Sequence, residues 1–382
     1  MNQVIATERI PIKMWTDTIE DGALAQAKNL ANLPFTYKHI AIMPDVHVGY
    51  GMPIGGVMVA KGVVVPNAVG VDIGCGMTAI KSDIKVESID KDQLKSWLGL
   101  IREAIPVGFN HNKDPQESEI FKYMPDLLIL RTELSSAKKQ LGTLGGGNHF
   151  IEIQKDEDGF LWIMIHSGSR NLGKKVADFY HTLAKGYCEQ WYSNIPTLDL
   201  AFLPINTQEG QEYFSAMNFC LDFAYANRAL MLRKVTDIIG SEHFGDDAII
   251  NIHHNYAAWE NHFGDNVLIH RKGATLARKG TIGIIPGSMG TNSYIVKGLG
   301  NEQSFNSCSH GAGRRLGRKE ACRTLVLKEE QDKMAGIIGA PRNQDDLEEA
   351  PGAYKSINEV MENQSDLVEI LTKLTPLAVV KG

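Results

Sequence analysis

A carboxylate and a thiol lie three residues apart in the glycine-rich stretch at residues 70–77, which reads G-V-D-I-G-C-G-M. Because the surrounding glycines allow positive φ and close approach, Asp72 and Cys75 can turn toward one point and bind a metal ion. An isolated pair of this kind is more often a turn aspartate beside a buried cysteine. Residues elsewhere in the chain must decide between these two interpretations.

Three histidines could add imidazole ligands to this pair. His149, His166 and His254 each lie where a predicted strand begins or ends, so the backbone beside them is expected to be rigid. Their spacings of 17 and 88 residues match no compact metal-binding motif, and a single histidine is more often a core or surface residue. Together these loops nevertheless favour a site for one or two transition-metal ions. Thiolate and imidazole ligands favour zinc, and the carboxylate also admits manganese.

Several glycine-rich turns could bind phosphate through exposed backbone N–H groups. They lie at residues 145–147, 286–293 and 310–313. The cations that could accompany a bound anion are Arg170, Lys272, Arg314, Arg315 and Arg318. The chain has neither the G-x-x-x-x-G-K-[ST] phosphate loop nor a G-x-G-x-x-G between a first strand and helix, so no standard nucleotide fold is predicted. His310, between Ser309 and Gly311, could act as a nucleophile with an open approach.

Short apolar strands that end in polar loops position most of these residues. Strands are predicted at residues 39–43, 57–65, 149–153, 161–165, 248–252, 266–269 and 281–285, with an irregular Gly- and Pro-rich loop at 44–56. Helices are predicted at residues 20–33, 89–105 and 133–140, over most of 174–240, and at 356–374. On a strand that begins at His149, alternation places Phe150 and Glu152 on one face and His149 on the other.

Composition limits the class of protein. The chain has 382 residues, 43% of them hydrophobic, which suffices for one large domain or two ordinary ones. The sequence lacks an apolar stretch of membrane-spanning length and a signal-peptide pattern, so we expect a cytoplasmic protein. Its five cysteines form no C-x-x-C pair and no predicted disulfide framework. A net charge of −6 excludes a uniformly basic surface, so an anionic partner must meet a local patch.

A series of motifs resembles the family of RtcB-type RNA-splicing ligases. The motifs are D-V-H-x-G-Y-G from Asp45, G-V-D-I-G-C-G from Gly70, G-T-L-G-G-G-N-H-F-I-E from Gly142, H-S-G-S-R from His166, H-H-N-Y from His253, H-R-K-G-A from His270, G-S-M-G-T from Gly287, S-H-G-A-G-R from Ser309 and the final V-K-G. They span nearly the whole chain in the family's order. The resemblance implies an α+β fold, with residues 1–382 forming a single compact domain in which mixed β-sheets and surrounding helices enclose a two-metal site.

The resemblance also implies an activity and its partners. A GTP- and Mn²⁺-dependent ligase would join RNA 3′-phosphate or 2′,3′-cyclic phosphate ends to 5′-hydroxyl ends in RNA splicing or repair. The reaction would pass through a histidine–GMP intermediate and an RNA end activated by guanylyl transfer. The partners would be RNA and GTP, and an activating protein could be a further partner. We expect a monomer and no membrane association.

The site residues follow from the same resemblance. Asp72, Cys75, His149, His166 and His254 resemble the ligands of two manganese ions bridged by Cys75, so the resemblance favours manganese over zinc. His310 resembles the histidine that accepts GMP. The other implied catalytic residues are Asp45, Arg170, Lys272 and Arg318, and the implied nucleotide contacts are Asn148, Phe150, Glu152, Ser288, Ser293, Ala312, Gly313 and Lys381. We expect the basic residues of the catalytic set to bind phosphates and not to form structural ion pairs.

Two other functions remain possible from the residues. A metal-dependent phosphodiesterase or phosphatase acting on RNA ends could use the same ions without a nucleotide intermediate, and it would need neither His310 nor the nucleotide turns. A non-catalytic RNA-binding relative could keep the fold. The presence of every ligand and of the nucleophile disfavours this second alternative.

Overall fold

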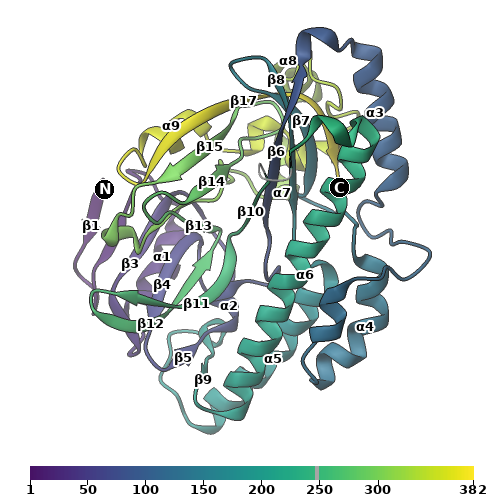
Figure 1. The fold of residues 1–382 in the computed structure, drawn as a ribbon. Coiled ribbons are helices and arrows are strands. Elements are labelled where there is room, and N and C mark those ends of the chain that lie inside the picture. The colour runs from purple at the N-terminus through teal and green to yellow at the C-terminus, as the bar shows by residue number, and fades with distance from the viewer. Residues whose placement is uncertain (246–248) are drawn as a thin grey trace.

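The computed structural model describes residues 1–245 and 249–382, and two β-sheets with flanking helices form most of this part (Figure 1). The first sheet has six strands in the order β1-β2-β3-β4-β12-β11. Their bounds are β1 (Gln3–Ile5), β2 (Ile12–Met14), β3 (Thr36–His47), β4 (Ile54–Ala60), β12 (Asp265–Lys272) and β11 (Asn255–His262). The sheet is mixed, because β2 and β3 are parallel while the other neighbours are antiparallel.

The second sheet has seven strands in the order β10-β6-β8-β7-β17-β15-β14, and its described pairs are all antiparallel. Its strands are β10 (Ile250–His253), β6 (Gly76–Lys85), β8 (Phe160–Ser167), β7 (Phe150–Lys155), β17 (Val368–Lys381), β15 (Ser293–Gly298) and β14 (Ile282–Ile285). Two small ribbons pair β13 (Ala274–Leu276) with β16 (Ser307–Ser309) and β5 (Val63–Val64) with β9 (Leu203–Pro204).

The described helices are α1 (Asp21–Ala31), α2 (Pro66–Val69), α3 (Lys91–Ala104), α4 (Leu128–Gln140), α5 (Arg170–Gln190), α6 (Gln208–Ile239), α7 (Arg318–Thr324), α8 (Leu327–Lys333) and α9 (Ile357–Glu362). Four of the helices, α3 to α6, gather on one side of the second sheet (Figure 1). Short 3₁₀ turns lie at Val86–Ser88, Glu119–Tyr123, Leu198–Leu200, Ser241–His243, Glu302–Ser304, Asp345–Glu349 and Pro351–Ala353.

The two faces of the second sheet bury different side chains. In β8, Ile163 and Ile165 pack in a core with residues of α3 and α6. Trp162 and Met164 alternate with them and join a separate core on the opposite face. This period of two places His166, the next residue of the second set, on the face opposite α3 and α6. The apolar core on one face therefore leaves the other face free for polar chemistry.

The fold class predicted from the sequence is confirmed as α+β, and most helices and strands lie where they were predicted. The prediction that residues 1–382 form one domain stays a prediction. The first residue of the strand predicted at 248–252 lies outside the described residues, and β10 begins at Ile250 and covers the last three residues of that prediction. Part of the predicted loop at 44–56 is regular, because β3 continues to His47 and β4 begins at Ile54.

Two further predictions are wrong. A helix was predicted at 356–374, but α9 ends at Glu362 and β17 begins at Val368. This strand pairs with β15 on one side and β7 on the other, and these partners are distant in sequence. The strand predicted from His149 begins instead at Phe150, so His149 lies outside it and strand alternation does not decide where its ring points.

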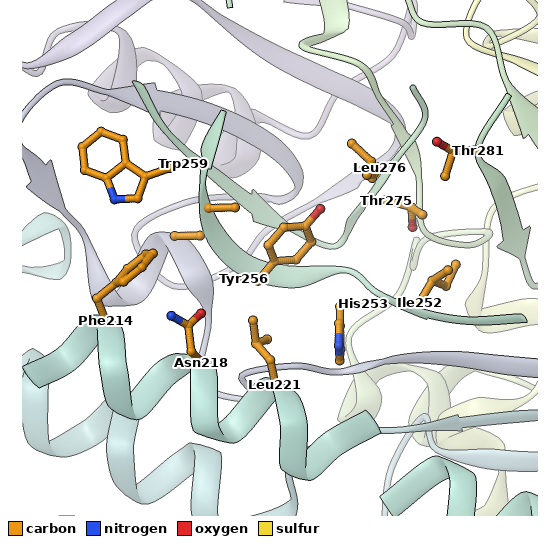
Figure 2. A pocket seen from close by; sticks show the side chains of 12 residues that line it. Phe214, Asn218, Leu221, Ile252, His253, Tyr256, Trp259, Thr275, Leu276 and Thr281 are labelled. Atoms are coloured by element: carbon orange, nitrogen blue, oxygen red, sulfur yellow. The ribbon is translucent and has the colours of Figure 1, made fainter. Parts of the chain in front are cut away.

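A cavity of about 490 Å³ lies between α6 and the strands β10, β11 and β13 (Figure 2). Its walls are largely apolar and include Phe214, Leu221 and Trp259, with His253 at one end. No helix among residues 1–245 and 249–382 combines the length and the apolar character needed to cross a membrane.

Candidate metal centre and nucleotide site

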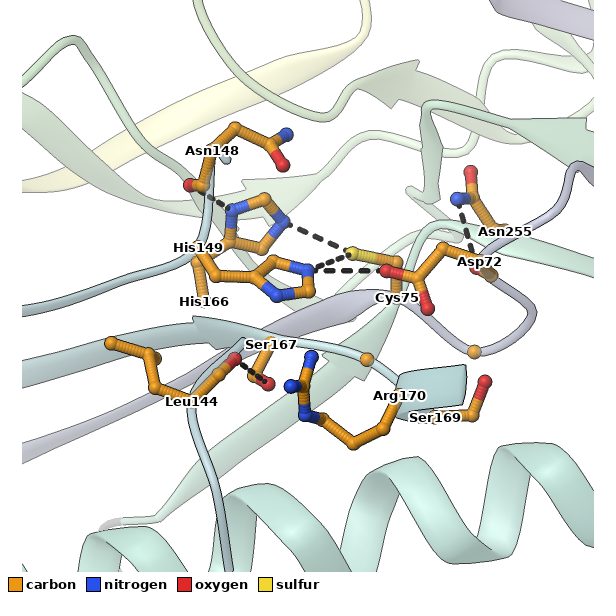
Figure 3. A network of polar contacts seen from close by, with 12 residues as sticks. Asp72, Cys75, Leu144, Asn148, His149, His166, Ser167, Ser169, Arg170 and Asn255 are labelled. Carbon is orange, nitrogen blue, oxygen red and sulfur yellow. Dashed lines mark hydrogen bonds and ion pairs between the residues drawn. The ribbon is translucent and has the colours of Figure 1, made fainter. Parts of the chain in front are cut away.

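The five predicted metal ligands form one contiguous cluster, most of which is drawn in Figure 3. Cys75 Sγ lies 3.2 Å from His166 Nε2 and 3.5 Å from His149 Nε2. Asp72 Oδ2 lies 3.1 Å from His149 Nε2, and His254 Nε2 lies 3.4 Å from His166 Nε2. The thiol therefore stands at the centre, with a carboxylate–imidazole pair on one side and an imidazole pair on the other.

Strand pairing explains why residues so far apart in sequence meet here. Cys75 directly precedes β6, whose first residue, Gly76, pairs with Ser167 of β8 and with His253 of β10. His166 and His254 are the sequence neighbours of those two partners. On the other side of β8, His166 pairs with Phe150, the first residue of β7. The start of β6, the ends of β8 and β10, and the residue before β7 therefore meet at one point. At these places lie Cys75, His166, His254 and His149, respectively.

Glycine is required where two other segments approach the cluster. A Cβ atom at Gly168 would collide with the carboxylate of Asp72. Gly145 has a φ of 96°, and a Cβ atom there would collide with His149 and Arg170. Any larger residue at these two positions would push the loops away from the ligands.

The protonation states suit a metal site. Burial lowers the pKa of His166 and of His254 well below the ordinary value, so both rings are neutral near pH 7. His166 Nδ1 donates to Asn148 O at 3.0 Å, which leaves the lone pair of Nε2 directed at Cys75. Burial, and then the charge of Asp72, raises the pKa of the Cys75 thiol, so a metal ion must displace its proton.

Unpartnered atoms support the same conclusion. Asp72 Oδ1, His149 Nδ1 and His254 Nδ1 are buried and have no hydrogen-bond partner among the described residues. Buried polar atoms are usually satisfied, and a metal ion would satisfy Asp72 Oδ1. The two histidines face the cluster with Nε2, so a metal ion bound there does not account for their Nδ1 atoms. The ligand atoms of Cys75, His149 and His166 lie within 4.8 Å of one another and could hold a metal ion. A set of thiolate, imidazole and carboxylate donors fits a divalent transition metal.

A second buried pair adjoins the cluster. His310 Nδ1 lies 2.6 Å from Asp45 Oδ2, and the same oxygen accepts the backbone N–H groups of His310 and Gly311 at 3.0 and 3.2 Å. Asp45 is fully buried. Burial alone would raise the pKa of Asp45, but the charge and hydrogen bonds of His310 outweigh it and lower the pKa. The side chain of His310 is 14% exposed, so the open approach predicted for it is wrong and the access is narrow.

The rings of several predicted site residues form a continuous row. The centroids of His310 and His254 are 4.8 Å apart, those of His254 and His166 are 5.2 Å apart, and those of His166 and Phe150 are 5.6 Å apart. Lys381 Nζ lies 5.4 Å from the centre of the Phe150 ring. The predicted nucleophile, metal ligands and nucleotide contacts are therefore one site.

Predicted nucleotide contacts surround the far end of this row. Gln154 Nε2 donates to Glu152 Oε2 at 2.6 Å and to Ser293 Oγ at 3.2 Å, which joins β7 to the start of β15. Burial raises the pKa of Glu152 to about 7, although Lys381 opposes this effect. The hydroxyls of Ser288 and Thr291 lie 3.0 Å apart within the adjacent turn.

Two predicted contacts lie beside His310 in the chain. Ala312 is buried in a core cluster to which both sheets contribute. Gly313, with a φ of 72°, packs so closely on the backbone of Asp45 that a Cβ atom would collide with it. This turn therefore fixes the distance between His310 and Asp45.

The predicted anion-binding residues differ in their surroundings. Arg170 has the uncommon positive φ of 58° for a non-glycine residue, and its guanidinium donates to Thr143 Oγ1 at 3.0 Å and Gly108 O at 2.9 Å. Lys272 Nζ donates to Tyr50 O at 2.6 Å and Asn67 O at 2.9 Å, and burial lowers its pKa to about 7.

Neither Arg170 nor Lys272 lies within ion-pair distance of a described carboxylate. Arg318, by contrast, is paired with Glu349 at 3.3 Å. The expectation that none of the three would form an ion pair is therefore wrong for Arg318. The long charged side chain reaches a buried carboxylate that local sequence does not reveal.

Three residues near the site were not predicted. Glu349 is buried and pairs with Arg314 at 3.0 Å as well as with Arg318, and no sequence pattern singles it out. Asn227 and Arg228 are fully buried in the middle of α6. They share its core-facing side with Ala224 and Met231, and polar residues at such helical spacing are a signal that could have identified them.

The fold and the site define a class of protein: an α+β enzyme with a buried centre of imidazole, thiol and carboxylate groups beside a histidine held by an aspartate. The family model described as tRNA-splicing ligase RtcB matches residues 26–128 and 118–382 of this chain. The chain therefore belongs to the RtcB family, a family of RNA ligases.

Individual relatives agree with this assignment over the full length. The chain is 38% identical to the RNA-splicing ligase RtcB of Escherichia coli (strain K12), in an alignment that covers 100% of this chain and 99% of that protein. It is 32% identical to the tRNA-splicing ligase RtcB of Archaeoglobus fulgidus, with 95% and 92% covered. It is 30% identical to the tRNA-splicing ligase RtcB of Thermococcus kodakarensis, with 98% and 95% covered.

Proposed function

We propose that this chain is a GTP- and Mn²⁺-dependent ligase that joins RNA 3′-phosphate or 2′,3′-cyclic phosphate ends to 5′-hydroxyl ends, in tRNA splicing or RNA repair. The observation that carries the proposal is the pair of Asp45 and His310, whose ring packs 4.8 Å from that of His254. A nucleophile beside a metal-type cluster suits nucleotidyl transfer.

Asp45 prepares His310 for attack on GTP. Because the carboxylate of Asp45 can only accept, Nδ1–H donates to it and the lone pair of Nε2 is available. Nε2 would attack the α-phosphorus, forming a P–N bond as the bond to the bridging oxygen breaks and pyrophosphate leaves. The ring becomes positively charged in this step, and Asp45, which stays ionised, stabilises that charge.

Two groups of residues would hold the metal ions. Asp72, Cys75 and His149 form one group, and Cys75, His166 and His254 form the other, so Cys75 is shared. Bound Mn²⁺ would neutralise phosphate charge and polarise the phosphorus centres.

The remaining residues would bind the nucleotide and the RNA. We assign Glu152 to the N–H donors of guanine, and Phe150, Asn148, Ser288, Ser293 and Lys381 to other contacts with GTP, together with Ala312 and Gly313. Arg170, Lys272 and Arg318 would bind the phosphates of GTP and of the RNA end. With a net charge of −6, the chain needs local basic groups to bind RNA, and these three residues would supply them.

Two further exchanges at phosphorus complete the ligation. An oxygen of the RNA 3′-phosphate attacks the guanylyl phosphorus, the P–N bond breaks, and His310 regains its lone pair. The 5′-hydroxyl oxygen then attacks the activated 3′-phosphorus, a phosphodiester forms and GMP leaves. A 2′,3′-cyclic phosphate must first add water and release its 2′-oxygen to give the 3′-phosphate.

Products distinguish this reaction from its alternatives. Purified protein with Mn²⁺, GTP and a pair of RNA oligonucleotides bearing 3′-phosphate and 5′-hydroxyl ends should give a joined product whose junction contains the original 3′-phosphorus. A metal-dependent phosphatase would release inorganic phosphate without joining, and a binding protein would leave both ends unchanged. Joining that proceeds equally well without any nucleotide triphosphate would contradict the proposal.

The family's partners and location complete the proposal. We propose RNA and GTP as the ligands, a monomeric state and a cytoplasmic location. The location is supported by the five cysteines, all of which are free thiols, as expected in a reducing compartment.

A further inference from the structure

Arg228 is a fully buried arginine in the middle of α6. It contacts the chain segments that carry the candidate metal ligands. Its Nη1 donates to Gly74 O at 3.0 Å and to Ser167 O at 2.9 Å. Its Nη2 lies 3.2 Å from His253 Nδ1, and its Nε donates to Asn251 Oδ1 at 2.8 Å. One guanidinium group therefore contacts the loop before β6, the end of β8 and the strand β10.

Each of the first three contacts is next to a candidate metal ligand. Gly74 precedes Cys75, Ser167 follows His166, and His253 precedes His254. A planar guanidinium fixes the relative positions of its acceptors, because its N–H groups point in set directions. Arg228 thus sets the spacing of the backbone segments that carry these three ligands.

The surroundings of Arg228 point away from an ordinary structural ion pair. No carboxylate among the described residues lies within ion-pair distance of it, and burying an unpaired charge is costly. Burial lowers its pKa to about 10, so it stays charged near pH 7. The neighbouring groups Cys75, Asp72 and Tyr225 oppose this effect.

Strand pairing also holds the third segment, because His253 pairs with Gly76 and the backbone N–H of His254 donates to Cys75 O at 2.9 Å. His253 lines the cavity of about 490 Å³ (Figure 2), and its Nδ1 lies 3.2 Å from Arg228 Nη2 and 3.0 Å from Gly74 O. If the bond to Arg228 were lost, this ring would have space to rotate away from the cluster. The residue before His254 would then lose its side-chain anchor, and the backbone hydrogen bond from His254 to Cys75 O would be left to hold the segment.

We propose that Arg228 is a positioning residue for the metal centre: its guanidinium holds the backbone segments of Cys75, His166 and His254 at the spacing that metal binding requires. The inference rests on the proposed metal site but not on the ligase reaction. Its neighbour Asn227 supports the same region, since it donates from Nδ2 to Gly168 O and to Ser167 Oγ, both at 3.2 Å.

The test compares two buried arginines that undergo the same change. Arg228→Lys keeps the charge but loses the fork of donors. Arg271→Lys is the matched control, because Arg271 is also fully buried and its guanidinium bonds Glu260, Tyr256 and Ser307, none of which directly precedes or follows a candidate ligand. Mn²⁺ affinity is measured by titration calorimetry, and the absorption spectrum of the Co²⁺-loaded protein reports the thiolate–metal bond and its geometry.

Arg228→Lys should weaken Mn²⁺ binding by about 10- to 100-fold, the usual effect of losing a residue that supports metal ligands. It should also change the Co²⁺ spectrum, whereas Arg271→Lys should match the wild type in both measurements even where its thermal stability is lower. Unchanged affinity and spectrum in Arg228→Lys would overturn the proposal, as would equal changes in the two variants. Tighter Mn²⁺ binding would also overturn it, because the proposal requires that loss of the donor fork weaken the site.

A milder variant covers the case in which Arg228→Lys does not fold. Asn251→Ala removes the acceptor of Arg228 Nε without altering a residue that precedes or follows a ligand in the chain. We expect a smaller loss of Mn²⁺ affinity with the same direction of spectral change, and wild-type values would contradict the proposal. These readouts are independent of ligation. If the wild type binds Mn²⁺ and Co²⁺ but forms no GMP adduct, the ligase mechanism fails while this inference stands.

Discussion

Asp45 Oδ2 lies 2.6 Å from His310 Nδ1 and also accepts the backbone N–H groups of His310 and Gly311. A single carboxylate oxygen therefore fixes both the ring and the backbone of the proposed nucleophile. The other oxygen, Oδ1, is buried and has no described partner. This arrangement assigns Nδ1 as the donor and leaves Nε2 for phosphorus.

Asp45→Asn should separate orientation from metal binding. An amide in this place can donate to Nδ1, which would put the ring proton on Nε2 and block attack. We expect formation of the GMP adduct to slow by about 10⁴-fold, the scale seen when an aspartate that orients a reacting histidine becomes asparagine. Mn²⁺ content should remain that of the wild type. Normal adduct formation, measured with α-labelled GTP, would contradict the assigned role of Asp45.

Cys75→Ala should lower the occupancy of both metal ions, because the thiol contacts both halves of the cluster. Ligation should be lost with them. Cys188→Ala is the control, since Cys188 is an equally buried thiol in the helical core. Metal analysis of both purified variants gives the answer, and full Mn²⁺ content with wild-type ligation in Cys75→Ala would mean that the thiol is only a buried core residue.

Glu152 should make the stability of the metal-free, GTP-free protein depend on pH. Burial raises its pKa from the ordinary 4.5 to about 7, so between these pH values the folded state binds more protons than the unfolded state. The free energy of unfolding therefore falls as pH rises from about 4.5 to 7, by on the order of 3 kcal/mol from this group. The stabilisation that comes from protonation of Glu152 in the folded state is fully lost above about pH 7.

Glu152→Gln cannot ionise and provides the comparison. The difference in free energy of unfolding between the wild type and this variant, measured by denaturant titration at a series of pH values, should favour the variant progressively up to about pH 7 to 8. A difference that is constant with pH would show that Glu152 titrates normally. GTP binding by the variant should also weaken, because an amide in place of the carboxylate offers a poorer acceptor to guanine.

Arg318→Ala should weaken the binding of RNA ends with little effect on folding. The side chain is 52% exposed, and Glu349 keeps Arg314 as a partner, so we expect a stability loss within about 1 kcal/mol. Loss of a phosphate contact should lower the salt dependence of RNA binding as well as its affinity. Arg342→Ala, which alters another exposed arginine paired with a carboxylate at 3.6 Å, is the control. A large drop in melting temperature with unchanged RNA affinity would assign Arg318 a structural role instead.

Local patterns in the sequence were sufficient for most of the fold, and the failures have a common cause. Apolar periodicity predicted α1, α3 and the long α6 because each buries one continuous stripe. The error at residues 356–374 arose because β17 is defined by pairing with β7 and β15, which lie far away in the chain. Alternating and helical patterns are difficult to distinguish in such a short apolar run.

The candidate site also has residues that the sequence could identify and residues that it could not. Cys75, His149, His166 and His254 could be selected from the sequence because reactive side chains at strand ends in glycine-rich loops are unusual. The residues that support them could not, since Arg228 acts on backbone carbonyl groups that carry no sequence signal. The narrow access to His310 was also invisible, because distant segments bury its ring.

The covalent step is the central claim, and His310→Ala tests it most directly. Wild-type protein incubated with Mn²⁺ and α-labelled GTP should acquire an acid-labile, base-stable label, as expected for a phosphorus–nitrogen bond, and peptide mapping should locate it at His310. The variant should bind Mn²⁺ normally, acquire no label, and still seal an RNA whose 3′ end already carries the guanylyl group. A label that persists in His310→Ala, or a wild-type protein that joins RNA but is never labelled by GTP, would contradict the proposed mechanism.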